Sequence, residues 1–352
     1  MRFNLSKVDI NLSAFTVLLL ENVFDLLEPL FVKPEKTPAR CNFADIPQSV
    51  SFIDSDVVLY GVPLDITTSF GKGTSRGPEA LRLTSSRQIE TYIFEEKTSI
   101  QDLLKIYDIG DLKLPSSSPA KGHKHHNTNK NKAINSMTAF LDQAIPKITG
   151  QLYNNGNKVP LIIGGEHTLS YYAIKSMAFE QPLIIHFDAH RDMKEQYEGI
   201  KICHTTPFFH LLNEGYIRGN DLIQIGIRQG DREENKMAED NGVATFDAWN
   251  VYDNIQSVIN YLQKKTQHRK LYITFDIDVY DLPYVPCTGT PEPFGMNPFQ
   301  VTKIIRSIDK SAQLIGMDIV EVSLKNNDYR EGTLATHTLL RILASRLIRT
   351  RR

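Results

Sequence analysis

Acidic and imidazole side chains alternate in the segment His186–Met193, which reads HFDAHRDM. Asp188, His190 and Asp192 stand two residues apart, directly after the apolar run PLII at 182–185. Because alternate side chains of an extended chain point to the same side, these three groups are predicted to project together from the carboxyl end of a buried strand. Buried carboxylates are costly to desolvate unless a cation compensates them, so the segment predicts a metal site.

The same pattern recurs at two other places in the chain. An apolar run in LYITFDIDVYD, residues 271–281, ends in Asp276 and Asp278, and PLIIGGEHTLS at 160–170 delivers His167 after another. A lone aspartate pair or histidine after a strand is more often a helix cap or a turn former than a ligand. Three clusters at strand ends are different, because ligands of open α/β sheets bind outside the carboxyl ends of the strands.

The three clusters together offer six candidate ligands: His167, Asp188, His190, Asp192, Asp276 and Asp278. The set contains no thiolate, and oxygen outnumbers nitrogen, which favours Mn²⁺ or a similar divalent ion such as Ni²⁺ over a structural zinc site. Two such ions could share ligands and lower the pKa of a water bound between them. The expected chemistry is metal-assisted hydrolysis.

These motifs resemble those of the ureohydrolases, the family of arginase, agmatinase and formiminoglutamase. The family patterns G-G-x-H-S, D-A-H-x-D and S-F-D-x-D-x-x-D-P correspond here to GGEHT, DAHRD and TFDIDVYDLP. Thr168 and Thr274 replace serines and Leu282 is inserted before Pro283, but no ligand is lost. The resemblance covers residues 55–348 and is nearest to agmatinase. It implies an arginase-like fold, a three-layer αβα sandwich with a mainly parallel sheet and helices on both faces.

The resemblance also assigns the six ligands to two Mn²⁺ ions bridged by Asp188 and Asp276. The remaining ligands divide between the ions, with His167 and Asp192 at one and His190 and Asp278 at the other. The implied nucleophile is a hydroxide between the metals, which Asp192 would orient by accepting a hydrogen bond.

Two further residues match catalytic positions of the family. His204 in ICHTTPF matches the histidine that shuttles protons or binds substrate, and an ordinary pKa near 6.5 would suit that task. A structural histidine is the alternative. Glu321 in IVEVS matches the carboxylate that pairs with a guanidinium group, a planar cation with fixed donors.

The segment between the second motif and His204 bears on the substrate. Met193 stands where arginases carry an asparagine, and Glu195 and Glu198 offer no cation to an α-carboxylate. The expected substrate is therefore agmatine, hydrolysed to putrescine and urea as in polyamine biosynthesis, with Glu195 and Glu198 near its amine. The alternative is that these two glutamates form a solvated loop face. Arginase, guanidinobutyrase, guanidinase and aminopropylagmatine ureohydrolase activities stay open.

Two readings from other classes are less favoured. A non-enzymatic metal-binding descendant of the fold has no need to keep all six ligands together with His204 and Glu321. A histone-deacetylase-like amide hydrolase uses a single zinc site, which the paired ligand set contradicts. A thiol nucleophile at Cys203 is disfavoured because adjacent residues of an extended chain point apart.

Length and composition fit an enzyme with a small-molecule substrate. The chain has 352 residues, 41% of them hydrophobic, enough for one catalytic domain over residues 51–352. Its 40 basic and 41 acidic residues announce no nucleic-acid or membrane surface. Three cysteines without metal spacing fit a reducing cytosol. A cytoplasmic homo-oligomer, trimeric or hexameric, is implied by the resemblance alone.

Two segments fall outside the catalytic pattern. The N-terminal extension, residues 1–50, contains an apolar stretch at 11–32 that charged residues interrupt, which predicts a packed amphipathic helix rather than a membrane span or signal peptide. Residues 116–132 predict a flexible polar insertion. Its three histidines are expected to be solvated rather than to bind a metal: His123, His125 and His126.

Elsewhere strands and helices alternate, which indicates a parallel sheet covered on both faces. Strands are expected near 56–61, 160–163, 182–187, 222–227, 271–276 and 314–320. Helices are expected near 77–94, 133–155, 168–177, 206–214, 232–241, 252–265, 298–310 and 331–348.

Overall fold

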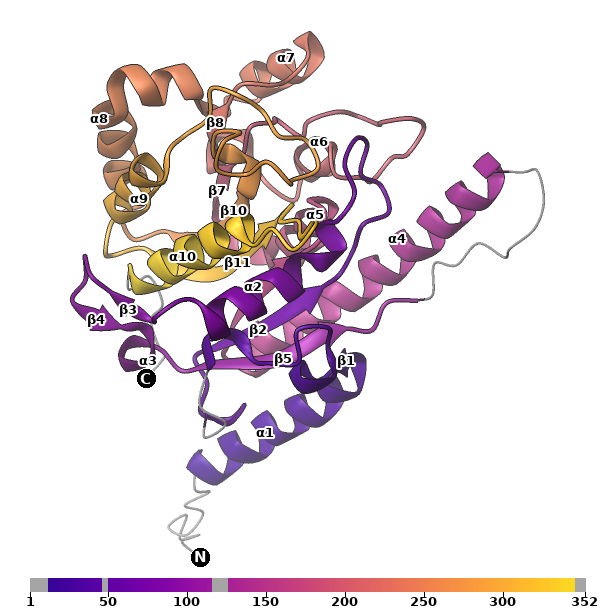
Figure 1. Ribbon diagram of the computed structural model, residues 1–352, viewed down its shortest axis with the longest axis vertical. Helices are drawn as coiled ribbons and strands as arrows, with labels where there is room; N and C mark the ends of the chain where they lie inside the picture. The colour runs from indigo at the N-terminus through magenta and orange to yellow at the C-terminus, as the bar shows by residue number, and fades with distance from the viewer. Residues whose placement is uncertain (1–11, 46–49, 116–125, 346–352) are drawn as a thin grey trace, which may run out of the picture.

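A computed structural model describes residues 12–45, 50–115 and 126–345, and over these ranges the chain forms one mainly parallel sheet between two layers of helices (Figure 1). The strand order is β1-β5-β2-β6-β11-β10-β7-β8-β9, and only the short β1 runs antiparallel to its neighbour. The strands are β1 (Phe31–Val32), β2 (Val57–Val62), β5 (Ile106–Leu112), β6 (Val159–Gly164), β7 (Leu183–Phe187), β8 (Leu222–Ile227), β9 (Ala244–Asp247), β10 (Lys270–Asp276) and β11 (Gln313–Val320). The three-layer αβα prediction is confirmed.

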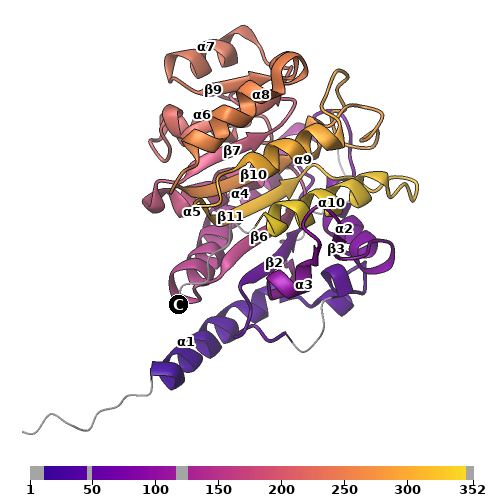
Figure 2. The same ribbon diagram turned by 90° about the vertical axis from the view of Figure 1, so that its left-hand side faces the viewer.

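Two hydrophobic clusters show which helices cover which face. One cluster joins the sheet to α2 (Gly77–Arg87), α3 (Ile100–Leu103), α8 (Ala248–Lys265), α9 (Pro298–Ser307) and α10 (Arg330–Ala344). The other joins it to α1 (Leu12–Leu27), α4 (His126–Gly150), α5 (Thr168–Met177), α6 (Pro207–Asn213) and α7 (Arg232–Asp240). Figure 2 shows the two layers on either side of the strands.

The central strands are buried on both faces, which explains why they read as continuous apolar runs. In β10, Leu271, Ile273 and Phe275 belong to the first cluster, while Tyr272, between Leu271 and Ile273, belongs to the second. Both clusters therefore draw on the same strand through the two-residue alternation of its side chains.

The six predicted strands are all present, but β1, β5 and β9 were not predicted. In β5, Asp108 and Asp111 interrupt the apolar pattern. Both carboxylates are buried against the guanidinium of Arg82 on α2, at 2.8 and 2.5 Å. A buried ion pair supplied by a distant helix makes charged strand positions tolerable, and that partner is invisible to local patterning.

Several element boundaries differ from prediction for local reasons. Helix α2 ends at Arg87 rather than 94, because β3 (Tyr92–Ile93) and β4 (Thr98–Ser99) form a small hairpin. Helix α8 begins at Ala248 because Asp247 and Asn250 form a reciprocal capping box there.

The polar insertion was also predicted too long. Helix α4 begins at His126, so residues 126–132 are helical and the prediction of a flexible segment is wrong for them. Residues 116–125, with His123 and His125, lie outside the described residues.

The N-terminal segment forms a helix as expected, over Leu12–Leu27. Leu20, Val23 and Leu27 are buried, whereas Leu18 is 56% exposed. No helix in the described part of the chain is long and apolar enough to cross a membrane.

The strand order determines what can meet at the carboxyl edge of the sheet. The four central neighbours are β6, β11, β10 and β7. Three of them precede the predicted metal motifs, and β11, which precedes Glu321, lies between β6 and β10. Segments more than 150 residues apart in sequence, such as His167 and Glu321, are thereby brought to one edge.

Candidate metal centre

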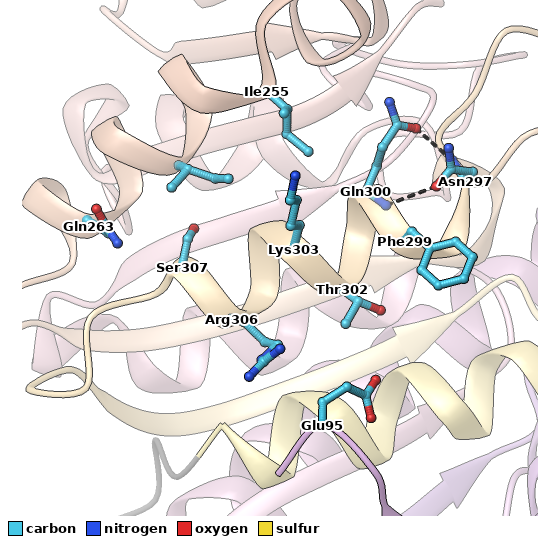
Figure 3. Close-up of a pocket in the computed structure, with 11 residues that line it drawn as sticks. Glu95, Ile255, Gln263, Asn297, Phe299, Gln300, Thr302, Lys303, Arg306 and Ser307 are labelled. Atoms are coloured by element: carbon cyan, nitrogen blue, oxygen red, sulfur yellow. Dashed lines mark hydrogen bonds between the residues drawn. The ribbon is translucent and has the colours of Figure 1, made fainter.

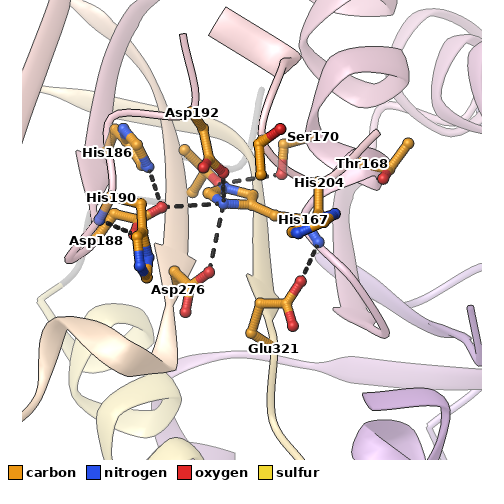
Figure 4. Close-up of polar contacts among 12 residues, drawn as sticks. His167, Thr168, Ser170, His186, Asp188, His190, Asp192, His204, Asp276 and Glu321 are labelled. Atoms are coloured by element: carbon orange, nitrogen blue, oxygen red, sulfur yellow. Dashed lines mark hydrogen bonds and ion pairs between the residues drawn. The ribbon is translucent and has the colours of Figure 1, made fainter. Parts of the chain in front are cut away.

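Asp188 and Asp276 leave neighbouring strands at the same level. Phe187 of β7 is in register with Phe275 of β10, so the next residue on each strand is one of the two aspartates. Both carboxylates are almost completely buried. Both carboxylates face Nδ1 of His167, and Figure 4 shows these two contacts as dashed lines.

One half of the cluster surrounds the ring of His167. Its Nδ1 atom lies 2.9 Å from Oδ2 of Asp192, 3.1 Å from Oδ2 of Asp188 and 3.4 Å from Oδ2 of Asp276. This nitrogen is buried and has no hydrogen-bond partner among the described residues. A buried imidazole nitrogen directed at three carboxylates suits a cation between them.

The other half surrounds His190, whose Nδ1 lies 3.0 Å from Oδ2 of Asp278 and 3.4 Å from Oδ1 of Asp188. The Asp278 side chain is held by the backbone amide of Ala189 at 3.0 Å. The structure thus brings all six predicted ligands together, with Asp188 in contact with both histidines.

Two carboxylates of the cluster have raised pKa values. Burial raises the pKa of Asp276 well above its usual value, and the nearby Asp278 and Asp188 raise it further. Burial and Asp188 raise the pKa of Asp192 to about 7. Carboxylates forced so close together favour protons or metal ions between them, so these residues fit a pair of divalent cations.

A buried network holds the outer side of the His167 ring. Its Nε2 lies 3.0 Å from the hydroxyl of Thr274, which donates a 2.7 Å hydrogen bond to Asp318. The Tyr272 hydroxyl donates to the other oxygen of Asp318, also at 2.7 Å. Threonine at position 274 therefore keeps the hydroxyl of the usual serine. Sequence reasoning missed Asp318 and Tyr272, which look like ordinary strand residues.

Glu321 lies beside the cluster and is buried. Its Oε1 accepts a 2.7 Å hydrogen bond from the backbone amide of His167. Burial and the nearby Glu166 raise its pKa well above the usual value. A carboxylate in this setting favours a cationic partner, as a guanidinium-binding residue would.

Asp192 and Glu321 share a strained backbone conformation. Their φ angles are 52° and 60°, in the left-handed region that non-glycine residues seldom adopt. Such strain costs on the order of 1–3 kcal/mol and clusters at functional sites.

Figure 4 shows His204 to the right of the His167 ring, on the side away from His190. Its Nδ1 is 3.3 Å from the Thr67 hydroxyl and its Nε2 is 3.2 Å from the Ser69 hydroxyl. Burial lowers its pKa to about 4, and cationic His190 adds to the shift. The ordinary pKa near 6.5, on which the proton-shuttle argument relied, does not hold in this setting.

Glu166 positions His204 indirectly, a role that sequence reasoning missed. It accepts a 2.6 Å hydrogen bond from the Thr67 hydroxyl and a 2.8 Å bond from the Thr67 amide. Thr67 in turn contacts His204. The only sequence signal was the place of Glu166 next to His167 in the first motif.

The other predicted substrate residues lie apart from this group. Glu195 and Glu198 are exposed, and Glu198 occupies the tip of the turn closed by Tyr197 and Ile200. Among the described residues neither glutamate side chain contacts a ligand or His204. Cys203 is buried, and burial raises the pKa of its thiol, which disfavours a thiolate nucleophile.

A different glutamate lies at the edge of the centre. Oε1 of Glu292 is 3.8 Å from Nε2 of His190, and its Oε2 accepts a 3.1 Å hydrogen bond from Gln229. Arg228 fixes the loop by donating to the carbonyls of Glu292 and Pro293. The sequence indicated Glu292 only weakly, because this residue lies in a loop segment and does not directly follow a strand.

A separate groove lies between α8 and α9 (Figure 3). Ile255, Phe299 and Lys303 are among its lining residues, and no metal-centre residue reaches it. It belongs to another part of the surface.

Comparisons with known proteins agree with the geometry. The model of the family described as "Arginase family" matches residues 55–344. An agmatinase of Bacillus anthracis is 31% identical over 278 residues, which cover 78% of this chain and 85% of the relative. An N(1)-aminopropylagmatine ureohydrolase of Thermus thermophilus is 27% identical over 287 residues, covering 80% and 87%.

A solved structure shows the same fold. The agmatine ureohydrolase of Thermoplasma volcanium superposes with a TM-score of 0.72 at 24% identity, covering 87% of this chain and 94% of that one. With the family match over most of its length, the chain belongs to the arginase family, as an agmatinase-like hydrolase that acts on amidino C–N bonds.

Proposed function

We propose that this protein hydrolyses agmatine to urea and putrescine with two divalent metal ions, Mn²⁺ being the best match to the ligands. The observation that carries the proposal is the hydrogen bond between Glu321 and the amide of His167. It fixes a guanidinium-binding carboxylate directly beside six clustered metal ligands.

The six ligands would hold the ions as two groups sharing Asp188 and Asp276. When bound, two such ions would activate water for attack on the guanidinium carbon and stabilise the charge that develops. Oxygen donors predominate in the set, which is why Mn²⁺ is preferred.

The remaining steps fall to side chains of this chain. Glu321 holds and orients the guanidinium. Asp192, on its strained backbone, accepts a hydrogen bond from the attacking water. His204 is neutral at working pH and hydrogen-bonds the reacting nitrogen, with its ring held at the hydroxyls of Ser69 and Thr67. One water is consumed, the C–N bond breaks, and the amine leaves with an added proton.

Charges at the edge of the centre support a cationic tail. Glu292 has a lowered pKa, owing chiefly to its hydrogen bond with His190, and so is charged at neutral pH. Lys72 is paired with Asp65 at 3.1 Å, which offsets its charge. Glu195 and Glu198 could act only if a loop movement brought them inward, so Glu292 is the better partner for the amine of agmatine.

A second candidate is a guanidino carboxylate such as 4-guanidinobutyrate, and Lys325 favours it. Close approaches at two glycines place Lys325 near Glu321. A Cβ atom added to Gly71 would lie 3.0 Å from Nζ of Lys325 and 2.7 Å from the carbonyl of Gly289. A Cβ on Gly289 would in turn lie 3.3 Å from Oε2 of Glu321. Lys325 forms no ion pair with any carboxylate of the described ranges, so its ammonium group, 3.5 Å from the carbonyl of Thr288, is available near Glu321.

A substrate panel tests the proposal. Urea release is measured after Mn²⁺ loading with agmatine, aminopropylagmatine, 4-guanidinobutyrate, L-arginine and guanidine. We expect kcat/KM for agmatine to exceed that for arginine by at least about tenfold, equal to ~1.4 kcal/mol. Preference for guanidinobutyrate would support the second candidate, and no urea from any guanidine would contradict both.

A further inference from the structure

His186 is a buried histidine in β7 that is not one of the six predicted metal ligands. Its Nε2 lies 2.7 Å from Oδ2 of Asp188, and its ring packs on Phe208 at 4.1 Å between centroids and a 30° angle. With His167 and Asp188 it could form a metal-binding triplet by distance alone. The hydrogen bonds of His186 show whether it binds a metal ion itself or orients the ligand Asp188.

Gln224 sits directly across from His186, because the two residues are in register on β8 and β7. Its Oε1 accepts a 2.8 Å hydrogen bond from the Arg191 guanidinium, and its Nε2 donates a 2.9 Å bond to the Arg191 carbonyl. A guanidinium only donates and a carbonyl only accepts, so both ends of the Gln224 amide are assigned.

This assignment fixes the tautomer of His186. The Gln224 amide nitrogen lies 3.2 Å from Nδ1 of His186, and since it can only donate, Nδ1 must accept. The ring proton is then on Nε2, where it is donated to Asp188. With its proton there, Nε2 has no lone pair for a metal, so His186 is not a ligand in this arrangement.

Arg191 closes the network onto the metal-binding loop itself. It stands between His190 and Asp192, and its guanidinium also binds Asn235 at 2.8 Å and Thr245 at 3.1 Å. Hydrogen bonds therefore connect Asp188, His186, Gln224 and Arg191 in series. The backbone from Arg191 back to Asp188 closes this network. The buried side chains tie the shape of the loop to the orientation of one carboxylate.

The two oxygens of Asp188 face different halves of the centre. Oδ2 is 3.1 Å from Nδ1 of His167, and Oδ1 is 3.4 Å from Nδ1 of His190. Each oxygen has one N–H donor of its own: the His186 ring for Oδ2 and the backbone amide of His190, at 2.5 Å, for Oδ1. Only the first donor is a side chain that can be exchanged.

We propose that His186 is a positioning residue that holds Oδ2 of Asp188 toward the His167 half of the centre, with Gln224 and Arg191 fixing its tautomer. A neutral N–H orients the carboxylate without adding a positive charge beside the metals. The inference rests on the two-metal centre of the proposed function but not on the identity of the substrate.

Three substitutions at one position test it. His186→Phe keeps the ring against Phe208 but removes the donor. His186→Gln can place an amide N–H near the former Nε2, whereas His186→Asn places it near Nδ1. His210→Phe is the matched control, because His210 is buried and binds the carbonyl of Glu195 at 2.9 Å without touching a ligand.

The readout is Mn²⁺ titration of metal-free protein by calorimetry, with the spin-coupled Mn²⁺ pair followed by electron paramagnetic resonance. His186→Phe should weaken one of the two ions about 10–100-fold and reduce the coupled signal, while His186→Gln stays within about threefold of the natural protein. His186→Asn should resemble the phenylalanine variant, and His210→Phe should bind both ions normally.

Thermal unfolding of the metal-free variants separates positioning from general packing. We expect His186→Phe to unfold within a few degrees of His210→Phe. Unchanged affinity for both ions in His186→Phe would overturn the proposal, as would equal loss in all three His186 variants accompanied by lower metal-free stability. Because no substrate is used, this metal-binding test is independent of the outcome of the substrate panel.

Discussion

The backbone amide of His167 donates a 2.7 Å hydrogen bond to Oε1 of Glu321. The same residue therefore presents its ring to the metal cluster and its amide to the carboxylate proposed to hold the guanidinium. Substrate and metals are positioned from one point at the end of β6, so a shift of His167 would disturb both.

The first prediction concerns Glu321. Glu321→Gln can still accept from the His167 amide but loses the charge that pairs with a guanidinium. We expect kcat/KM to fall by roughly a hundredfold, about 2–3 kcal/mol, with two metals still bound. Steady-state kinetics and elemental analysis measure this, with the exposed Glu195→Gln as control. Unchanged kcat/KM would remove Glu321 from the guanidinium site.

The second prediction concerns the bridging aspartates. Asp276→Asn should weaken both metals, each by more than the roughly 10–100-fold that outer hydrogen-bond partners contribute, and abolish turnover. Asp281→Asn is the control, because Asp281 accepts from the Gly295 amide and lies outside the cluster. An active Asp276→Asn protein with two bound metals would disprove the bridging assignment.

The third prediction separates the two candidate substrates by charge. If Glu292 receives the amine of agmatine, Glu292→Gln should raise KM for agmatine about five- to tenfold, consistent with ~1 kcal/mol for a solvated ion pair near 4 Å. Lys325→Met should leave that KM nearly unchanged. The opposite pattern, with guanidinobutyrate losing affinity in Lys325→Met, would identify Lys325 as the tail partner.

The fourth prediction concerns acid stability of the metal-free protein. His204 has a pKa of about 4 when folded, against 6.5 for the free side chain. Between these values the unfolded chain binds the extra proton, so the free energy of unfolding falls as pH falls, with a contribution of up to roughly 3 kcal/mol.

Urea denaturation at pH 4.5–7 in small steps measures this dependence. In His204→Asn the slope should be smaller by up to about 1.4 kcal/mol per pH unit. The exposed His268→Asn is the control for loss of a histidine and should follow the natural protein. Parallel curves of unfolding free energy against pH for all three proteins would show that burial does not shift the pKa of His204.

Much of the centre could be predicted from sequence because strands impose a period of two. Asp188, His190 and Asp192 follow an apolar run at that spacing, as do Asp276 and Asp278. The pattern therefore predicts that their side chains project from strand ends. The local pattern also predicted the six central strands, since continuous apolar runs suit strands covered on both faces.

The partners of these residues could not be predicted, because they come from distant parts of the chain. Nothing near His186 indicates Gln224, and nothing near Asp108 indicates Arg82. The choice between Glu195 and Glu292 likewise depends on how two loops fold over the edge of the sheet. Short-range patterns do not contain that information.

The sequence by itself determined which groups could bind metal, because residue type and two-residue spacing are local properties. Only the tertiary structure decided how they meet, by inserting β11 between β6 and β10 and setting Phe187 level with Phe275. Strand order and register depend on packing the whole sheet against both helical layers. For that reason the tautomer of His186, the low pKa of His204 and the exposure of Glu195 follow from the fold rather than from any motif.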